Sequence, residues 1–144
     1  MIKDDKNYNI VVIEDNIGDF FLLEEYLNEK INNPLVNHFE RFSEFTKIAD
    51  SIDEVDIIFL DLSLPDKSGK ELVEEVLKIS RNIPVVVLTG LSDFSFALKA
   101  IALGASDYLL KDELNSVALY KSIVYNIERF KNIIKIKESE QLYT

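Results

Sequence analysis

Short continuous apolar runs alternate along this chain with longer stretches in which apolar residues recur every three or four positions. A continuous run predicts a strand buried on both faces, and the three-to-four spacing predicts an amphipathic helix. The clearest run covers residues 57–60 and stops at a carboxylate, Asp61. Pro65 and Gly69 follow, so we expect a loop directly after this acid.

The predicted elements alternate strictly between strand and helix. We expect strands at residues 8–13, 36–39, 55–60, 85–88 and 106–110. We expect helices at residues 17–31, 43–52, 68–80 and 93–103, and a long last helix from about residue 113. Asn16 or Asp15 is predicted to cap the first helix and Ser43 the second, and Gly104 is predicted to end the fourth. This alternation indicates one α/β domain with a parallel sheet and helices on both faces.

Composition limits the classes of function. The 144 residues suffice for one domain, and 47% hydrophobic with 29% charged residues is typical of a globular chain. No apolar run is long enough for a bilayer, the N-terminus has no signal-peptide pattern, and the absence of cysteine excludes disulfides. We therefore expect a cytoplasmic protein without membrane contact. A net charge of −10 argues against direct nucleic-acid binding and favours a cation or a basic partner.

Polar residues with chemical potential fall at the ends of the predicted strands. Glu14 and Asp15 follow the first strand, Asp61 ends the third, Thr89 ends the fourth and Lys111 follows the fifth. The carboxyl ends of parallel strands meet at one sheet edge, which is where open α/β sheets bind ligands. Three carboxylates there repel each other unless a cation joins them, and oxygen ligands suit Mg²⁺. An Asp can also accept a phosphoryl group, with a Lys and a hydroxyl holding its oxygens.

Each of these residues also has an ordinary structural interpretation. The acidic pair could complement the dipole of the first helix, and Asp61 could simply form a turn before Pro65. Thr89 could be a strand former, Lys111 a solvated surface charge and Tyr108 an ordinary aromatic residue of a strand. Taken singly, these interpretations are favoured, but five coincidences at one sheet edge favour the functional one. The lone His38 is interpreted as an ordinary polar residue, with no metal or phosphoacceptor role.

Together these residues resemble the receiver domain of two-component response regulators, of which the chemotaxis response regulator is a single-domain member. The resemblance covers roughly residues 8–130 and rests on the following pieces: Glu14-Asp15, Asp61-x-x-Leu64-Pro65-x-x-x-Gly69, Thr89-Gly90, and Tyr108 followed by Lys111. It implies a flavodoxin-like, doubly wound, five-stranded parallel sheet of order 2-1-3-4-5. Five helices are then expected, with the last one extended.

The resemblance also implies a role for each matching residue. Asp61 would be the phosphoacceptor, and Thr89 and Lys111 would hold the phosphoryl oxygens. The Mg²⁺ ligands would be Asp15, Asp61 and the backbone carbonyl of Ser63, with Glu14 acting through water. Tyr108 would be the aromatic residue that turns inward on activation. Ser63 and Leu91 occupy positions that tune dephosphorylation in the family.

The implied function is that of a phosphorelay signal receiver. A sensor histidine kinase or a histidine phosphotransfer protein would donate the phosphoryl group from a phosphohistidine in a Mg²⁺-dependent transfer. The surface formed by the fourth helix, fifth strand and fifth helix would then change. Apart from its own phosphorylation and dephosphorylation, the domain would not be an enzyme.

Two positions depart from the family pattern. Glu14 replaces the first Asp of the usual acidic pair, which keeps the charge but lengthens the side chain. Asp112 follows Lys111, where the family commonly has a proline in a cis bond. A cis bond without proline costs about 2.5–4 kcal/mol, so we expect a trans bond and a differently shaped loop.

The C-terminal segment allows two interpretations. Ile123, Ile127, Phe130 and Ile134 follow the 4-3-4 spacing of a short coiled coil. Alternatively, the helix packs on its own domain as far as Phe130 and then frays. We expect a receiver domain over residues 7–130 and a helical linker over residues 131–144. The ending resembles linkers that lead into PAS domains of hybrid signalling proteins, which predicts a missing output domain. A homodimer through this helix or through the fourth-helix surface is also expected.

Three other functions would fit parts of the same pattern. A haloacid-dehalogenase-type phosphatase also uses a strand-end Asp, but it needs a second Asp two residues later, where this chain has Ser63. A flavin-binding protein would need a phosphate-binding loop after the first strand, and Glu14-Asp15 would repel that phosphate. The remaining alternative is a receiver-like scaffold that acts without phosphorylation, and the sequence leaves it open.

Overall fold

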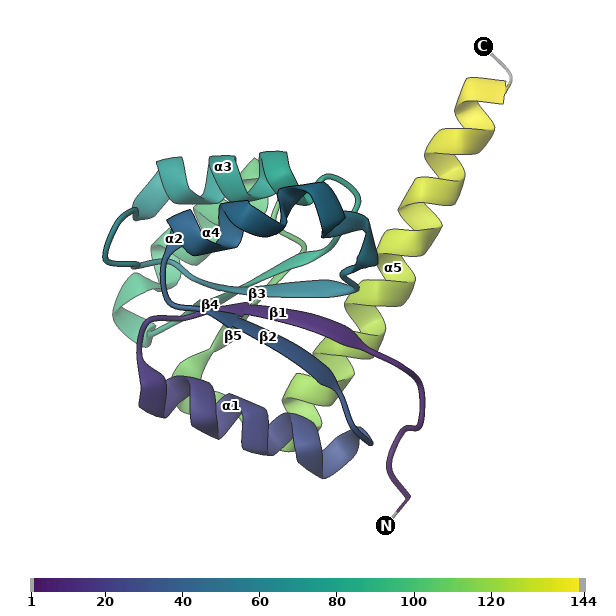
Figure 1. Ribbon diagram of the computed structural model, residues 1–144. Coiled ribbons are helices and arrows are strands. Elements are labelled where there is room, and N and C mark those ends of the chain that lie inside the picture. The colour runs from purple at the N-terminus through teal and green to yellow at the C-terminus, as the bar shows by residue number, and fades with distance from the viewer. Residues whose placement is uncertain (1, 143–144) are drawn as a thin grey trace.

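The computed structural model describes residues 2–142, in which parallel strands and helices alternate around one central sheet (Figure 1). The elements, in chain order, are β1 (Asn9–Ile13), α1 (Ile17–Lys30), β2 (Leu35–Phe39), α2 (Phe42–Phe45), the 3-10 helix η1 (Thr46–Glu54), β3 (Ile57–Asp61), α3 (Gly69–Ser80), β4 (Val85–Thr89), the 3-10 turn η2 (Leu91–Asp93), α4 (Phe94–Leu103), β5 (Asp107–Leu110), the 3-10 turn η3 (Lys111–Glu113) and α5 (Ser116–Leu142).

The five strands form a parallel sheet of order β2-β1-β3-β4-β5, which confirms the predicted flavodoxin-like topology. The order reverses between β1 and β3, and ligands of open α/β sheets bind at such a switch point. Helices α1 and α5 cover one face, and α2, α3 and α4 cover the other (Figure 1).

Side chains of the central strands point alternately into two cores. In β3, Ile57 and Phe59 contact the α1 and α5 side, whereas Ile58 and Leu60 contact the α2 and α3 side. All four are fully buried. The runs were continuously apolar because both faces of the sheet are covered, and burying each such side chain contributes about 1.5–3 kcal/mol.

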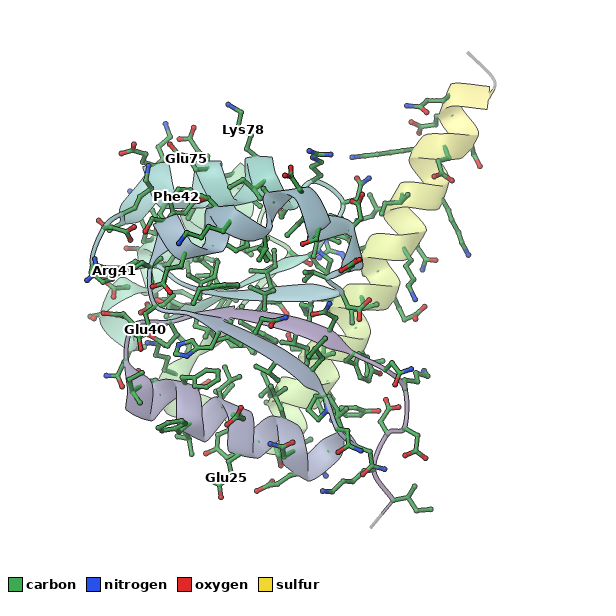
Figure 2. The ribbon with its side chains drawn as sticks, viewed as in Figure 1. Glu25, Glu40, Arg41, Phe42, Glu75 and Lys78 are labelled. Carbon is green, nitrogen blue, oxygen red and sulfur yellow. The ribbon has the colours of Figure 1, made fainter. Side chains whose placement is uncertain are left out.

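The start of α2 differs from the sequence prediction. The helix begins at Phe42, makes one α-helical turn and continues as the 3-10 helix η1. Its first free N–H groups, those of Phe42 and Ser43, both donate to the carboxylate of Asp66 at 3.0 Å. The prediction that Ser43 is the N-cap was therefore wrong. The capping group is Asp66, on a loop 23 residues after Ser43, and no local sequence pattern reveals it. Figure 2 shows Arg41 and Phe42 at this turn, and Glu25 on the outer side of α1.

The other predicted helix ends can also be compared. The Asn16 side chain accepts a hydrogen bond from the Asp19 N–H at 3.0 Å, so Asn16 caps α1. Gly104 ends α4 with a φ of 127°, which glycine adopts without a Cβ clash.

The last helix begins at Ser116 rather than at residue 113. Residues 111–113 form a 3-10 turn instead, and the Asn115 side chain caps the helix by accepting from the Ala118 N–H at 2.8 Å. No cis peptide occurs within residues 2–142, so the expected trans bond between Lys111 and Asp112 is confirmed.

Helix α5 is half embedded and half projecting. Ile123 is fully buried and Ile127 is 9% exposed in the core beneath the sheet, so these two residues do not belong to a seam that faces another chain. Asn126, also buried, accepts from the Ser106 hydroxyl at 2.6 Å and donates to the Asp107 carboxylate at 3.1 Å, which ties α5 to β5. Beyond residue 130 the helix continues away from the domain (Figure 1).

Within the described residues, no helix is apolar over a length that would cross a bilayer.

Candidate functional site

Strand register brings the polar strand-end residues to one edge of the sheet. β1 and β3 pair in parallel up to the residues just before Glu14 and Asp61, so these two acids are neighbours. β4 ends at Thr89, and Lys111 follows the last residue of β5. The sheet thus gathers residues from four strand ends that are far apart in the sequence.

Three carboxylates converge at this edge. Glu14, Asp15 and Asp61 each offer an oxygen, and these oxygens lie within 4.8 Å of one another. Glu14 is 1% exposed and the Asp61 side chain is 13% exposed, whereas Asp15 is open to solvent. Hard oxygen donors with one open side suit a divalent cation such as Mg²⁺.

The electrostatics of the cluster also fit a bound cation. Burial and the nearby Glu14 carboxylate together raise the pKa of Asp61 to about 8, although the Lys111 ammonium partly opposes them. Oε1 of Glu14 is buried and accepts no hydrogen bond within the described residues, so its compensation is an ion pair with Lys111. The cluster carries more negative charge than Lys111 alone neutralises, and a divalent cation would supply the remainder.

The Lys111 ammonium lies among three acids. Its Nζ is 2.7 Å from Glu14 Oε1, 3.0 Å from Asp19 Oδ2 and 3.6 Å from Asp61 Oδ2. Burial lowers the pKa of Lys111, but the Glu14 and Asp19 carboxylates outweigh burial and the net pKa is raised. Lys111 is therefore a permanent cation at the edge of the acidic cluster.

Asp19 also belongs to this edge, and the sequence pattern did not predict it there. An acid in the first turn of a helix ordinarily complements the helix dipole, and that interpretation drew no attention to its side chain. Its contact with Lys111 joins residues 92 positions apart. The spacing of Asp19 after Glu14-Asp15-Asn16, one helical turn beyond the strand end, was the signal that would have placed it at the same edge.

Thr89, Tyr108 and Ser63, which the sequence also assigned to the site, make ordinary structural contacts. Thr89 is buried, and its hydroxyl donates to the Gly90 carbonyl at 3.1 Å. Tyr108 is half-buried within β5, edge-on to the Phe94 ring with 5.3 Å between centroids. Ser63 lies on the loop after β3, and its N–H donates to Asp61 Oδ1 at 3.4 Å.

His38 lies closer to the site than the sequence suggested. Its Nε2 donates to the backbone carbonyl of Glu14 at 2.6 Å, and its ring stacks on Phe20 with 3.8 Å between centroids. A carbonyl oxygen can only accept, so this nitrogen bears the hydrogen. His38 thus supports the backbone of an acidic residue and does not contribute to the carboxylate cluster itself.

Comparisons with known proteins agree with this geometry. A family model described as the response regulator receiver domain matches residues 10–123. The sensory transduction protein LytR of Staphylococcus saprophyticus is 35% identical over 81 residues, which are 53% of this chain and 31% of that protein. The probable transcriptional regulatory protein SilR of Salmonella typhimurium is 30% identical over 104 residues, 71% of this chain and 43% of that protein.

Solved structures give the same result. A response regulator receiver domain protein from Clostridium thermocellum is 27% identical with a TM-score of 0.71, over 88% of this chain and 98% of that one. The chain spans less than half the length of the two curated relatives named above. With the family match over residues 10–123 and the acidic edge at its switch point, the chain belongs to the response regulator receiver domain family.

Proposed function

We propose that this receiver domain accepts a phosphoryl group on Asp61 in a Mg²⁺-dependent transfer from the phosphohistidine of a sensor histidine kinase or a histidine phosphotransfer protein. The observation that supports it most is the convergence of Glu14, Asp15 and Asp61 beside the Lys111 ammonium. Carboxylates alone would indicate a cation site, and the adjacent fixed cation adds a partner for phosphoryl oxygens.

The transfer itself is a displacement at phosphorus. One Oδ of Asp61 attacks, the P–O bond to the carboxylate forms, and the P–N bond to the histidine breaks with its electron pair left on nitrogen. Asp15, Asp61 and the Ser63 carbonyl would hold Mg²⁺, with Glu14 acting through water. The ion would neutralise charge on the carboxylates and the phosphoryl group. Attack by water on phosphorus later releases inorganic phosphate and restores the carboxylate.

Thr89 and Lys111 are proposed to hold the phosphoryl oxygens. For Thr89 this requires its hydroxyl to leave the Gly90 carbonyl. Movement of Thr89 toward the phosphate would vacate space near β5, and Tyr108 would turn inward from its edge contact with Phe94. Phe94 begins α4, so this change would alter the surface made by α4, β5 and α5.

That surface contains a groove suited to a partner. It measures about 450 Å³ and runs between α4 and α5, with Leu98, Ile101, Phe130 and Ile133 among its lining residues. We propose it as the output surface, for a homodimer or a downstream domain. In this proposal residues 7–130 form the receiver and residues 131–144 a linker, of which the structure describes the helix to residue 142.

The test is intact mass spectrometry after incubation with acetyl phosphate and Mg²⁺. We expect one phosphoryl adduct on the wild-type protein, and none on Asp61→Asn or after EDTA. Asp93→Asn is the matched control, since Asp93 lies near the same edge, beside Ser63 and Ser68, but is not proposed as a ligand. Full labelling of Asp61→Asn would refute the assignment, and no adduct under any condition would favour a phosphorylation-independent scaffold.

A further inference from the structure

Lys111 has a carboxylate partner with no role in the transfer just described. Asp19 lies in the first turn of α1, and its Oδ2 is 3.0 Å from the Lys111 Nζ. The corresponding distance to the phosphoacceptor, Asp61, is 3.6 Å. The lysine expected to serve Asp61 is therefore held more closely by an acid on a neighbouring helix.

Helix capping does not account for where the Asp19 side chain lies. Asn16-x-x-Asp19 has the spacing of a capping box, in which the acid would accept from the Asn16 N–H. In the structure, the Asn16 N–H instead donates to Glu14 Oε2 at 3.3 Å. The Asn16 side chain does cap the Asp19 N–H, which fixes the backbone of Asp19 and leaves its carboxylate directed at Lys111.

The Lys111 ammonium has carboxylate partners on two sides. Glu14 and Asp61 lie on its buried side, and Asp19, with a side chain 43% exposed, lies toward solvent. We propose that Asp19 is a positioning residue that shares the Lys111 ammonium with Glu14 and holds it away from Asp61 in the acidic cluster. It thereby limits how strongly Lys111 competes with a cation there and how tightly Lys111 holds a phosphoryl group on Asp61. The second effect rests on the proposed function, whereas the first concerns the cation site alone.

Asp19→Asn should shift both properties in opposite directions. Without the outer carboxylate, Lys111 moves fully onto Glu14 and Asp61, so Mg²⁺ binds more weakly. The same shift places Lys111 closer to a phosphoryl group on Asp61 and removes a nearby negative charge. A partly exposed ion pair is worth up to about 1 kcal/mol, so we expect changes of about two- to fivefold.

The first experiment is a calorimetric Mg²⁺ titration of the full chain. We expect Asp19→Asn to raise the dissociation constant about two- to fivefold, and Asp19→Glu and Asp93→Asn to leave it near the wild-type value. In a Lys111→Gln background, Asp19→Asn should have a clearly smaller effect. Equal increases with and without Lys111 would show that Asp19 acts by its charge alone, and would overturn the proposal, as would a wild-type protein that binds no Mg²⁺.

Lys111→Gln leaves the buried Glu14 without its ion pair, so this variant needs a check of folding by circular dichroism. If it does not fold, Lys111→Arg, which keeps the cation but alters its reach, replaces it as the background. The proposal then requires that Asp19→Asn changes Mg²⁺ affinity by a different factor in Lys111→Arg than in the wild-type protein. An unchanged effect in that background would refute it.

The second experiment measures the lifetime of the phosphoryl adduct at saturating Mg²⁺. Asp19→Asn should lengthen it about two- to fivefold, and Asp93→Asn should not. A shorter or unchanged lifetime would contradict the proposal. If the wild-type protein forms no adduct, the proposed function fails, and the Mg²⁺ titration still decides whether Asp19 controls Lys111.

Discussion

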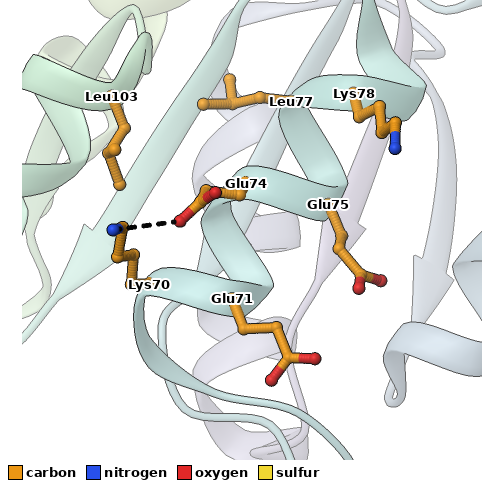
Figure 3. Close-up of a pocket in the computed structure, with 7 residues that line it drawn as sticks. All are labelled: Lys70, Glu71, Glu74, Glu75, Leu77, Lys78 and Leu103. Atoms are coloured by element: carbon orange, nitrogen blue, oxygen red, sulfur yellow. Dashed lines mark ion pairs between the residues drawn. The ribbon is translucent and has the colours of Figure 1, made fainter.

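Two acidic regions of this domain contain similar residues and have different physical character. At the sheet edge, Glu14, Asp15 and Asp61 bring their oxygens within 4.8 Å of one another. On α3, Glu71, Glu74 and Glu75 face outward beside the groove that leads to α4, and Figure 3 shows Lys70 reaching Glu74. The first region is largely buried, whereas the α3 glutamate side chains are 42–73% exposed.

The difference lies in how the charges are compensated. Lys67, two residues before α3, pairs with Glu71 and Glu75 at 3.3 and 3.0 Å, and Lys70 pairs with Glu74 at 3.6 Å. Water screens these pairs, and each is worth at most about 1 kcal/mol. At the sheet edge burial reduces that screening, so charge there changes pKa values, and a bound cation would lower the mutual repulsion of the carboxylates. The number of acidic residues therefore says less about function than their burial and convergence.

The strongest test of this comparison exchanges one glutamate in each region for glutamine. Glu14→Gln should weaken Mg²⁺ binding about ten- to hundredfold, the usual effect of removing a group that supports a metal ligand set. Glu74→Gln should leave the dissociation constant unchanged, because its carboxylate is exposed and paired with Lys70. Isothermal titration measures both. Equal effects of the two substitutions would show that general surface charge, not the buried cluster, attracts the ion.

The pH dependence of stability should separate the regions next. The pKa of Asp61 is raised to about 8 in the folded state, so the folded protein binds a proton there that the unfolded chain releases near pH 4. Stability without metal should therefore fall as pH rises from about 4 to about 8, by at most about 1.4 kcal/mol per pH unit and less where solvent screens the group.

Urea denaturation in EDTA at several pH values measures this dependence. Asp61→Asn should flatten the curve over that range, and saturating Mg²⁺ should do so too, because the ion favours the charged carboxylate. A wild-type curve that matches Asp61→Asn throughout would contradict the raised pKa.

A smaller effect is expected for an acid that serves structure. Asp66 accepts from the N–H groups of Phe42 and Ser43, so Asp66→Ala leaves the start of α2 uncapped. We expect a loss of about 1–2 kcal/mol in the free energy of unfolding, measured by urea denaturation. Ser43→Ala, at the cap that the sequence pattern predicted, should cost less. A larger loss of unfolding free energy from Ser43→Ala than from Asp66→Ala would show that Ser43 is the helix cap after all.

The smallest effect should come from the α3 surface. A double-mutant cycle of Lys70→Ala and Glu74→Ala should give a coupling of about 0.3–0.5 kcal/mol, as for other exposed pairs one helical turn apart. Moderate salt should remove most of it. A coupling above about 1 kcal/mol would mean that solvent exposure does not weaken the ion pairs of α3, and the contrast between the two acidic regions would fail.

Much of this architecture was predictable because it depends on patterns local to each element. Strands such as residues 57–60 are continuously apolar since both sheet faces are covered, and the alternation of strands and helices fixed the parallel topology. The acidic edge followed from that topology, because the carboxyl ends of parallel strands share an edge.

The missed features all involve contacts between distant residues. Asp19 meets Lys111 across 92 positions, and Asp66 caps a helix that begins 24 residues earlier. The apolar spacing of α5 fitted both a coiled coil and packing on its own domain, because the same periodicity serves either partner, and in the structure Ile123 and Ile127 pack on their own sheet. A periodic pattern identifies the buried face of a helix but does not identify what covers it.

Helix α5 has the mechanics of a lever. Asn126 fastens it to β5, the strand that contains Tyr108 and leads to Lys111. Beyond residue 130 the described helix extends by twelve residues, about 18 Å at 1.5 Å per residue. A tilt of about 10° where the helix leaves the domain, near residue 130, would displace the tip of an arm of this length by about 3 Å. A displacement too small to disturb the core would thus become a movement about as large as a water molecule at the far end of the arm.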